Sequence, residues 1–407
     1  MDSPRNITSQ NLPSDRSAAR LLPILAAVFL AFVVIGFAMP VLPLHVHKNL
    51  GFGTFVVGLV AGSQFGAAIL SRVWAGRYAD SRGPKAAVTS GLFVSTAAGL
   101  LYLSSLRFSF TPEVSVAILL LGRAVLGVGE SFIITGAQAW AVSISGVQNA
   151  GKVLGWVGSA MFAAFALGAP VGTVLYSTYG LLAIGLTTAL LPLATFAFVV
   201  PLRRVPSTPG VPTGFFRVLA AVWTPGIASA LSSVGFGAIT AFSALLLVGR
   251  GGAAWPAFTS FAAAFILTRA FLGHLADQFG GAKVALICAL IEAVGLSLIW
   301  LVPWVTLSLI GAAVTGFGYS LVYPAFGVEA VRSVPEHSRS LAMGAYTAFL
   351  DVALGLGIPA LGLIGDLAHL GTVFAVSTLA ALGAAAIAAA TLAKANNHCA
   401  CTALARS

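Results

Sequence analysis

Ionisable side chains inside long apolar segments are the residues of this sequence with the clearest capacity for chemistry. They are Arg123, Glu130, Glu292, Glu329 and Asp351. An ionised group in hydrocarbon is energetically costly, so it normally faces a cavity, a transport pathway or a partner of opposite charge. A buried carboxyl group that can bind and release a proton is therefore a candidate for proton coupling or for ligand binding.

The spacing of these groups separates the candidates. Arg123 and Glu130 are seven residues apart, which places them on one face of a helix but about two turns apart, too far for a direct pair. Each of them therefore needs another partner or water. Asp351 stands near the middle of its segment, whereas Glu329 stands near an end, where pairing with Arg332 is the simpler explanation.

Other chemistry is not indicated. The sequence has no Gly-x-x-x-x-Gly-Lys-Ser/Thr loop for nucleotide and no His-Glu-x-x-His cluster, which argues against an ATP-driven pump and a metalloenzyme. Cys288, Cys399 and Cys401 form no disulfide framework, and His398 beside the last two gives too few ligands for a closed metal site. We expect no enzyme activity, no metal and no cofactor; a channel or a non-transporting receptor is the alternative left open.

Composition identifies the elements that must position these groups. Of the 407 residues 58% are hydrophobic and 8% are charged, against about 25% charged in ordinary globular domains. Apolar runs of roughly twenty residues, enough to cross about 30 Å of hydrocarbon, recur along the chain, and they are continuous rather than alternating, so helices are expected. The twelve predicted transmembrane helices are 21–46, 55–78, 86–106, 114–141, 153–177, 181–201, 219–248, 254–276, 284–303, 306–331, 341–364 and 371–393.

The distribution of positive charge predicts the topology. Twelve spans place fifteen of the Lys and Arg residues on one face and three on the other. The first set is Arg5, Arg16, Arg20, Arg77, Arg82, Lys85, Lys152, Arg203, Arg204, Arg217, Lys283, Arg332, Arg339, Lys394 and Arg406, and the second is Lys48, Arg107 and Arg250. Basic loops lie in the cytoplasm, so both termini should be cytoplasmic, and the net charge of +10 indicates contact with anionic lipid rather than nucleic acid. The first twenty residues lack the pattern of a cleavable signal.

A polar stretch with three prolines between residues 202 and 212 divides the chain. We expect a cytoplasmic tail (1–20), a six-helix bundle (21–201), a cytoplasmic linker (202–218), a second six-helix bundle (219–393) and a cytoplasmic tail (394–407).

The two halves repeat each other. Leu70–Gly83 matches Leu267–Gly280 in register, and Gly127–Ser131 matches Gly316–Ser320. Repeats of six-helix halves are common in transporters. The predicted fold is therefore an all-α membrane protein with two pseudo-symmetric bundles.

The same register shows where the halves differ. Tyr319 occupies the position of Glu130, and Phe162 occupies the position of Asp351. Because the acid at Asp351 has no counterpart, it is not a repeat-wide structural device, which suits a coupling or ligand site. Arg123, Glu130, Asp351 and Tyr319 are the candidate residues for proton coupling or substrate binding.

Several motifs resemble those of the major facilitator superfamily. The segment Gly76–Lys85 resembles its signature between helices two and three, and Arg123–Gly127 resembles its fourth-helix motif, with Leu126 where glutamine is common. Gly168–Gly172 is similar to the fifth-helix motif of its antiporters, with Thr173 in place of the usual second glycine. In combination with Leu121–Arg123, Gly127–Ser131 and Ile133–Ala139, these motifs further resemble the bacterial YhhS-like efflux branch, related to drug–proton antiporters.

The resemblance implies a conformational latch that joins the halves at the cytoplasmic side when the outer side is open. The latch residues of the motif and of its second copy are Gly76, Asp80, Arg82, Gly83, Lys85, Gly273, Asp277 and Gly280. We expect the first glycine of each copy to allow close helix contact and the second to allow a tight turn. Asp80 can accept hydrogen bonds from a helix N-terminus across the interface. The second copy has Phe279 where the first has basic Arg82, so its latch should be weaker.

Glycine and proline in the fifth and eleventh helices have two interpretations. The residues are Gly168, Pro170, Gly172, Gly357 and Pro359. They bend the helices where the halves rock, or they provide ordinary close packing of small residues. The resemblance also places the ninth helix, with Glu292, on the outside of the bundle, and we find no functional argument for that acid.

The function that these features favour is a proton-coupled exporter of a small organic or amphiphilic molecule, working by alternating access with its site at the midplane. The alternative is a proton-coupled uptake symporter of a sugar, acid or other metabolite. Expected partners are the small-molecule substrate and membrane lipid, with no nucleic acid, and the expected form is a monomer in a bacterial inner membrane.

Overall fold

The computed structural model describes residues 15–146, 150–205, 219–334 and 339–404. These residues are almost entirely helical, and no strand occurs among them. Eleven helices of this part of the chain are long and apolar enough to cross a membrane, and Pro256–Leu272 is a shorter apolar helix. The predicted all-α membrane fold is confirmed.

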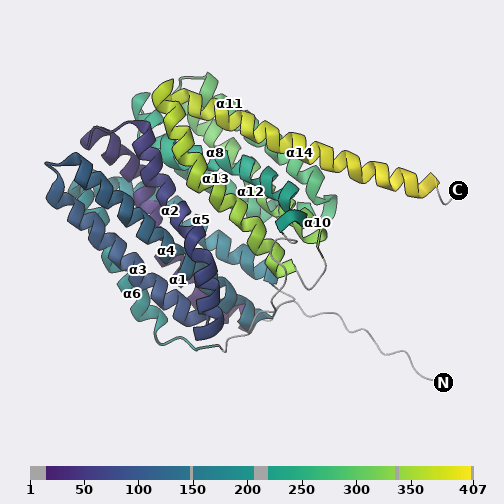
Figure 1. The fold of residues 1–407 in the computed structure, drawn as a ribbon, viewed down its shortest axis with the longest axis horizontal. Helices are drawn as coiled ribbons and strands as arrows, with labels where there is room; N and C mark the ends of the chain where they lie inside the picture. The colour runs from purple at the N-terminus through teal and green to yellow at the C-terminus, as the bar shows by residue number, and fades with distance from the viewer. Residues whose placement is uncertain (1–14, 147–149, 206–218, 335–338, 405–407) are drawn as a thin grey trace.

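The helices keep the labels of Figure 1, and their bounds follow in chain order. They are α1 (Asp15–Leu44), continued by a π-helical turn (His45–Asn49), α2 (Thr54–Arg82), α3 (Pro84–Ser105), a 3₁₀ turn (Leu106–Phe108), α4 (Pro112–Ser145), α5 (Ala150–Tyr179), α6 (Leu181–Val199), α8 (Trp223–Gly249), α9 (Pro256–Leu272), α10 (Leu275–Phe279), α11 (Gly281–Leu301), α12 (Val305–Arg332), α13 (Arg339–Leu367) and α14 (Leu370–Leu404).

The helices form two bundles, α1–α6 and α8–α14, which lie side by side in Figure 1 as the purple-to-teal and the green-to-yellow parts of the chain. Within the first bundle α3 packs on α4 and α6, and within the second α11 packs on α12 and α14. The bundles meet mainly where α2 contacts α13, where α5 contacts α9 and where α1 contacts α8.

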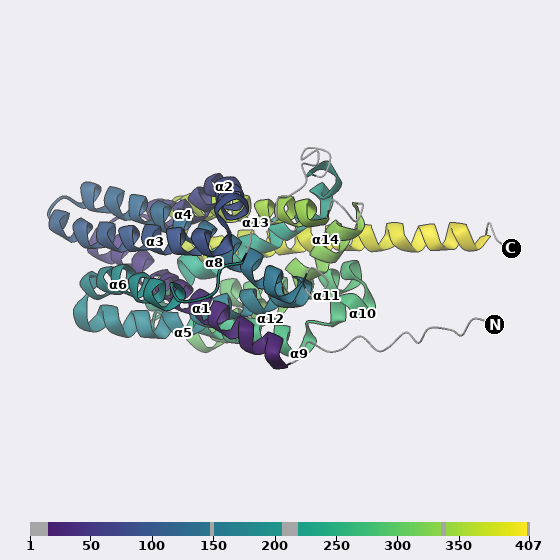
Figure 2. The same ribbon diagram turned by 90° about the horizontal axis from the view of Figure 1, so that it is seen from below.

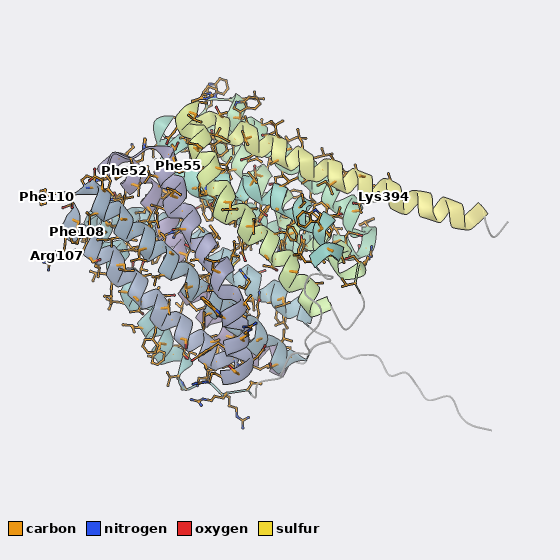
Figure 3. All side chains as sticks on the ribbon, viewed as in Figure 1. Phe52, Phe55, Arg107, Phe108, Phe110 and Lys394 are labelled. Carbon is orange, nitrogen blue, oxygen red and sulfur yellow. The ribbon has the colours of Figure 1, made fainter. Side chains whose placement is uncertain are left out.

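Successive helices run in opposite directions, so their connections gather at two ends of the molecule. We call the end that holds Gly83, Arg204 and Gly280 the basic face, and the other end the opposite face. Figure 3 shows Arg107, Phe108 and Phe110 at the opposite face, and it shows Lys394 on α14 far from them. Described side chains at the basic face include Arg77, Arg82, Lys85, Arg203, Arg204, Lys283, Arg332 and Lys394.

Proline and glycine set several helix limits. Proline begins α3, α4 and α9, a position where its missing N–H and fixed φ cost nothing. Gly83 and Gly280 precede α3 and α11 with φ of 91° and 87°, a conformation that side chains with a Cβ rarely adopt. These are the two glycines expected to allow tight turns.

Two boundaries differ from the sequence prediction. The predicted span 254–276 is interrupted, because α9 ends at Leu272 and α10 begins at Leu275. Gly273 lies at this unpredicted break, and the low helix propensity of glycine is its physical reason. At the other difference, α14 continues as a helix through the predicted tail to Leu404, well beyond its apolar span, which ends at Lys394 (Figure 2).

Parts of the predicted organisation lie outside the described residues. These are residues 1–14 of the N-terminal tail, residues 206–218 of the linker, and the side chains of Asp277, His398, Cys399 and Cys401.

The internal repeat is visible in equivalent backbone contacts. Gly127 of α4 packs against the Gln64 carbonyl of α2, and Gly316 of α12 packs against the Phe261 carbonyl of α9. A Cβ atom at either glycine would overlap that carbonyl oxygen, so both helix pairs require glycine there. The matched glycines of the sequence thus perform the same packing in both halves.

Candidate functional site

An ion pair joins the two bundles between α2 and α13. The Arg72 guanidinium lies 2.6 Å from the Asp351 carboxylate, and the two side chains are 27% and 6% exposed. Asp351 was a predicted site residue, whereas Arg72 was not. The sequence nevertheless contained a signal for Arg72, because the repeat aligns it with Arg269 and both arginines stand in apolar segments.

Glu130 of α4 belongs to the same group of charges. The Gln64 amide donates a hydrogen bond to the Glu130 carboxylate at 2.5 Å, and Gln64 is fully buried. Glu130 also interacts electrostatically with Asp351 and Arg72. We call Gln64, Arg72, Glu130 and Asp351 the charged cluster. It brings together both acids that the sequence identified as candidates for proton coupling.

Arg123 is also an electrostatic neighbour of Glu130, but no hydrogen bond or ion pair joins the two side chains, as their spacing predicted. The Arg123 side chain is buried, and among the described residues its Nε and Nη1 atoms have no hydrogen-bond partner. The Tyr102 hydroxyl is an electrostatic neighbour without hydrogen-bond geometry. A cavity of about 20 Å³ between α1, α2, α4 and α8 borders Arg123, large enough for about one water molecule.

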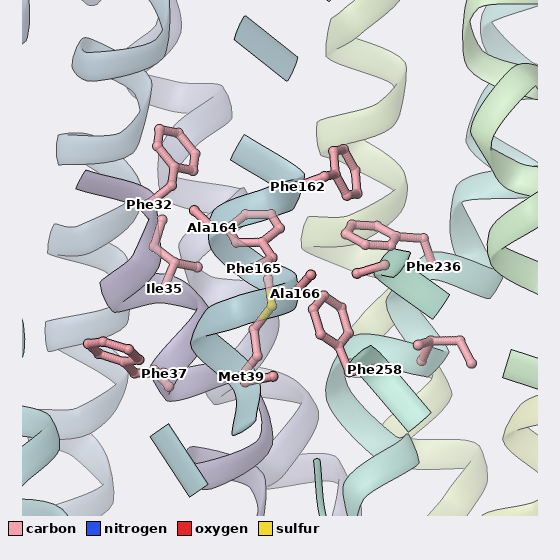
Figure 4. Packing of buried hydrophobic residues seen from close by; sticks show 14 of the residues in the cluster. Phe32, Ile35, Phe37, Met39, Phe162, Ala164, Phe165, Ala166, Phe236 and Phe258 are labelled. Carbon is pink, nitrogen blue, oxygen red and sulfur yellow. The ribbon is translucent and has the colours of Figure 1, made fainter. Parts of the chain in front are cut away.

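Aromatic side chains fill the contact between α5 and the second bundle. Phe162 of α5 stacks on Phe265 of α9 with ring centroids 3.8 Å apart, and Phe236 of α8 stacks on Tyr319 of α12 at 5.3 Å. Figure 4 shows Phe162 and Phe165 of α5 close to Phe236 of α8 and Phe258 of α9. We call this group the aromatic cluster; its members are Phe162, Phe165, Phe236, Phe258, Phe261, Phe265 and Tyr319.

The two clusters occupy equivalent positions in the internal repeat. The equivalent pairs are Gln64 with Phe261, Arg72 with Arg269, Glu130 with Tyr319, and Asp351 with Phe162. One set of positions is therefore polar and charged, the other is aromatic, and only the arginine is kept in both. The pseudo-symmetric framework holds two sites of different chemistry.

Glu292 of α11 is a buried acid outside the charged cluster, and Tyr319 of the aromatic cluster is its electrostatic neighbour. The Glu292 side chain is fully buried, accepts a hydrogen bond from the Ser232 hydroxyl of α8 and packs against Gly235. The resemblance placed its helix at the outside of the bundle, but the side chain points inward against α8 and α12. Among the described residues one carboxyl oxygen, Oε1, has no hydrogen-bond partner.

Glu329 has the partner that its position predicted. The Arg332 guanidinium lies 3.3 Å from the Glu329 carboxylate. The same carboxylate accepts a hydrogen bond from the Ala282 backbone N–H in the first turn of α11, at 3.2 Å. Glu329 therefore has a structural explanation at the basic face.

Among the described side chains of the predicted latch, no hydrogen bond or ion pair joins the bundles in this arrangement. Asp80 and Arg82 are exposed, and neither has a hydrogen bond or ion pair within the described part of the chain. Lys85 instead donates to the backbone carbonyls of Val200 and Leu202, at 2.5 and 2.7 Å, and so caps the end of α6.

The close helix contact expected at the first glycine of each latch copy is also absent here. A Cβ at Gly76 would have no described atom within 4 Å, and one at Gly273 would meet only the Arg269 carbonyl of its own segment. The physical reason is that both residues lie toward the basic face, beyond the contacts that join α2 to α13.

The bundles are joined at the opposite face by an unpredicted contact. Asp366 near the end of α13 accepts hydrogen bonds from the backbone N–H groups of Thr54 and Phe55 at 2.5 and 2.9 Å, and from the Thr54 hydroxyl at 2.8 Å. The Thr54 hydroxyl also donates to the Gly362 carbonyl at 2.7 Å. Asp366 thereby caps the N-terminus of a helix in the other bundle, the role that the sequence suggested for Asp80.

Three of the five predicted glycines and prolines, Gly168, Gly172 and Pro359, lie at close helix contacts. Gly168 of α5 packs on Gly36 of α1, and Gly172 packs on Phe37 one turn further along. Pro359 of α13 packs on Gly62 of α2 across the bundle interface. Helix α5 continues through Pro170, and α13 continues through Pro359. Around Gly357 the only neighbour is a Val234 methyl at 4.0 Å.

Two six-helix bundles with charged and aromatic clusters between them define a multi-pass membrane protein of the transporter class. The family model described as Major Facilitator Superfamily matches residues 24–256 and 226–398, and the chain belongs to this family. It is a transporter and not an enzyme.

Relatives of similar length share about two fifths of their residues with the chain. The uncharacterized MFS-type transporter YhhS of Escherichia coli is 39% identical over 95% of this chain and 94% of its own length. Uncharacterized MFS-type transporters of Salmonella typhimurium and Pseudomonas aeruginosa are also 39% identical, over 92% and 91% of this chain and 97% and 92% of their own.

Solved structures share the fold at low sequence identity. The nucleoside transporter NupG superposes with a TM-score of 0.71 at 16% identity, covering 92% of this chain and 98% of that one. A bacterial homologue of the human lysosomal transporter Spinster, described as inward-facing, gives 0.69 at 13% identity, covering 92% and 96%.

Proposed function

We propose that this transporter is a proton-coupled exporter of a small organic or amphiphilic molecule. The observation that carries the proposal is the ion pair between Arg72 and Asp351, which joins the two bundles beside the buried Glu130. In a transporter that works by alternating access, a protonatable group at the bundle interface links proton occupancy to the contact between the bundles.

The ion pair corresponds to the state from which the proton has left. A proton arriving at Asp351 neutralises the carboxylate and removes its attraction for Arg72. The contact between α2 and α13 then loses free energy, and the population of the two arrangements shifts. Coupling free energies of about 1–3 kcal/mol between two sites change affinities roughly 5- to 150-fold, so a single ion pair is sufficient. Glu130 lies in the same cluster and can share or relay the proton.

The membrane orientation belongs to the proposal. The basic face faces the cytoplasm of a bacterial inner membrane, with both termini inside, because positively charged loops are retained there. The contact of Asp366 with Thr54 then closes the periplasmic side, and the arrangement described above is inward-facing. The proton is the coupling ion, no other cofactor is involved, and the monomer in lipid is the working unit.

Export is favoured over uptake by the antiporter-like segment Gly168–Gly172. It packs against α1 at Gly36 and Phe37, on the side of α5 away from the aromatic contact with α9. A proton-coupled uptake symporter uses the same fold, so the direction of substrate movement relative to the proton distinguishes the two functions.

The test uses inverted membrane vesicles with an acidic lumen and a panel of anionic, cationic and neutral aromatic compounds, including 2-naphthoate, ethidium and 2-naphthamide. An exporter accumulates its substrate in the lumen while protons leave, which a fluorescent pH probe detects. An uptake symporter instead carries preloaded substrate out of the lumen together with protons.

Variants at the charged cluster test the coupling itself. Asp351→Asn and Glu130→Gln should lose accumulation driven by the pH gradient, because a neutral amide cannot exchange a proton between the two sides. Glu113→Gln, which removes an exposed acid at the opposite face, is the matched control and should transport normally. Full gradient-driven accumulation by both cluster variants would show that neither acid carries the proton.

A further inference from the structure

Arg269 is a cation within the membrane fold without an acidic partner. It lies in the last turn of α9, is only partly exposed, and among the described side chains has no ion pair or hydrogen bond. Its one specific contact is with the Phe265 ring, whose centroid lies 5.8 Å from the guanidinium carbon. A single cation–π contact contributes less than the cost of holding a guanidinium in an apolar environment.

The equivalent arginine of the first bundle shows what is missing. Arg72 is neutralised by Asp351, which comes from the other bundle. The residue in the corresponding place opposite Arg269 is Phe162, which cannot neutralise charge and instead stacks on Phe265. The repeat therefore preserves the arginine while replacing its counter-ion with an aromatic ring.

The surroundings of Arg269 are aromatic and hydroxylated. Tyr319 and Tyr323 are its electrostatic neighbours, and Tyr323 in turn interacts with Arg72 and Asp351. Tyr323 is thus an electrostatic neighbour of both arginines, one from each bundle. Its hydroxyl is hydrogen-bonded to the Thr347 hydroxyl at 2.7 Å, which fixes the ring of Tyr323 against α13.

We propose that Arg269, with Phe265, Tyr319 and Tyr323, forms the subsite for an anionic group on an aromatic or amphiphilic substrate. The substrate anion supplies the counter-charge that Asp351 supplies to Arg72, and the aromatic cluster receives the apolar part of the molecule. The inference rests on the proposed transport function and specifies its substrate class. It divides the interface into a proton site around Asp351 and a substrate site around Arg269.

Binding to the purified protein in detergent, at one pH and without a gradient, tests this subsite separately from coupling. The probes are radiolabelled 2-naphthoate and its uncharged analogue 2-naphthamide, which share the ring system and differ in charge. Wild-type protein should bind naphthoate more tightly than the amide. Arg269→Gln should weaken naphthoate binding about 10- to 100-fold, the loss expected for a charge-assisted contact, and should leave amide binding unchanged.

Two further variants control for folding and for charge elsewhere. Arg269→Lys keeps the charge and should retain part of the preference for the anion, and Arg107→Gln removes an exposed arginine at the opposite face and should change nothing. Equal wild-type affinity for both probes, no binding of naphthoate, or an unchanged preference in Arg269→Gln overturns the proposal. Because the comparison of the two probes uses wild-type protein, it holds even if the Gln variant does not fold. A failure of proton coupling would leave all of these binding results intact.

Discussion

At the scale of single residues, the pair of Arg72 and Asp351 gives a measurable coupling. Removing one partner leaves the other charged and poorly solvated, whereas removing both leaves no unpaired charge. We expect Arg72→Gln and Asp351→Asn each to lower the thermal stability of the purified protein. The double variant should lose less than the sum of the two, with a coupling free energy of about 1–3 kcal/mol. The partial exposure of Arg72 keeps the value below that of a fully buried pair.

This comparison of single and double variants, a double-mutant cycle, has a matched control and an outcome that would contradict it. Arg332 and Glu329 also form an ion pair, but it is more exposed and lies at the basic face. Arg332→Gln combined with Glu329→Gln should therefore show a coupling of about 1 kcal/mol or less. Additive effects of the Arg72 and Asp351 variants would mean that the pair does not join the bundles in solution.

At the residue scale, the sequence selected candidates where a charge stood in an apolar segment. Glu130 and Asp351 were identified because acids are rare in apolar segments, and the spacing of Arg123 from Glu130 excluded a direct pair. Which groups would meet was not predictable, because Arg72 and Asp351 are 279 positions apart in the chain and no local pattern specifies a contact between bundles. Gln64 escaped notice because a neutral amide in a membrane helix carries no charge signal.

At the scale of helices, the second prediction concerns the contact of Asp366 on α13 with the N-terminus of α2. Asp366 brings a negative charge to the N-terminus of α2, where the helix dipole and free N–H groups favour it. Asp366→Asn removes that charge and one strong acceptor. Loss of a helix cap costs about 0.5–2 kcal/mol, so the population closed at the opposite face should fall roughly 2- to 30-fold relative to the open one.

Spin labels at the opposite face measure this change. Arg107 and Trp304 are exposed and lie in different bundles. Because exposed positions should accept a label, the distance between Arg107→Cys and Trp304→Cys should report opening. The distribution should gain a longer component in Asp366→Asn but not in Glu113→Gln, which removes an exposed acid from the same face. Identical distributions in both variants would show that Asp366 does not hold the bundles together.

Helix existence was predictable, and some helix limits were not. Continuous apolar runs predict the helices because the backbone must satisfy its own hydrogen bonds in lipid. The predicted separation of spans 284–303 and 306–331 appears as the break between α11 and α12. The sequence did not predict the interruption at Gly273, because a glycine alone does not break a helix. Its counterpart Gly76 lies inside the unbroken α2. Equivalent sequences thus have different local structures. The difference depends on the helices packed around each segment, which the repeat in the sequence does not specify.

At the scale of the whole molecule, the two bundles share a framework but differ in chemistry. The glycines that set helix contacts are repeated, so the pseudo-symmetric fold follows from the sequence. The sequence also shows that Tyr319 stands at the position equivalent to Glu130, and Phe162 at the position equivalent to Asp351. The functional consequence of these differences depends on which residues meet between the bundles. Only the structure shows that one set of positions gathers charge and the other gathers aromatic rings around an arginine.

The last prediction concerns how the molecule lies in the membrane, and it follows from the gathering of Lys and Arg at the basic face. In a variant with all three cysteines replaced, Arg107→Cys should react with a membrane-impermeant maleimide in intact cells. Arg204→Cys should react only after the inner membrane is permeabilised, because positively charged connections remain in the cytoplasm. Trp304→Cys should behave like the first variant and Lys394→Cys like the second, since they lie at the opposite and basic faces. Labelling of Arg107→Cys and Arg204→Cys from the same side would contradict the alternation of helices. Labelling with the sides exchanged would place the contact of Asp366 with Thr54 in the cytoplasm and would make the described arrangement outward-facing instead of inward-facing.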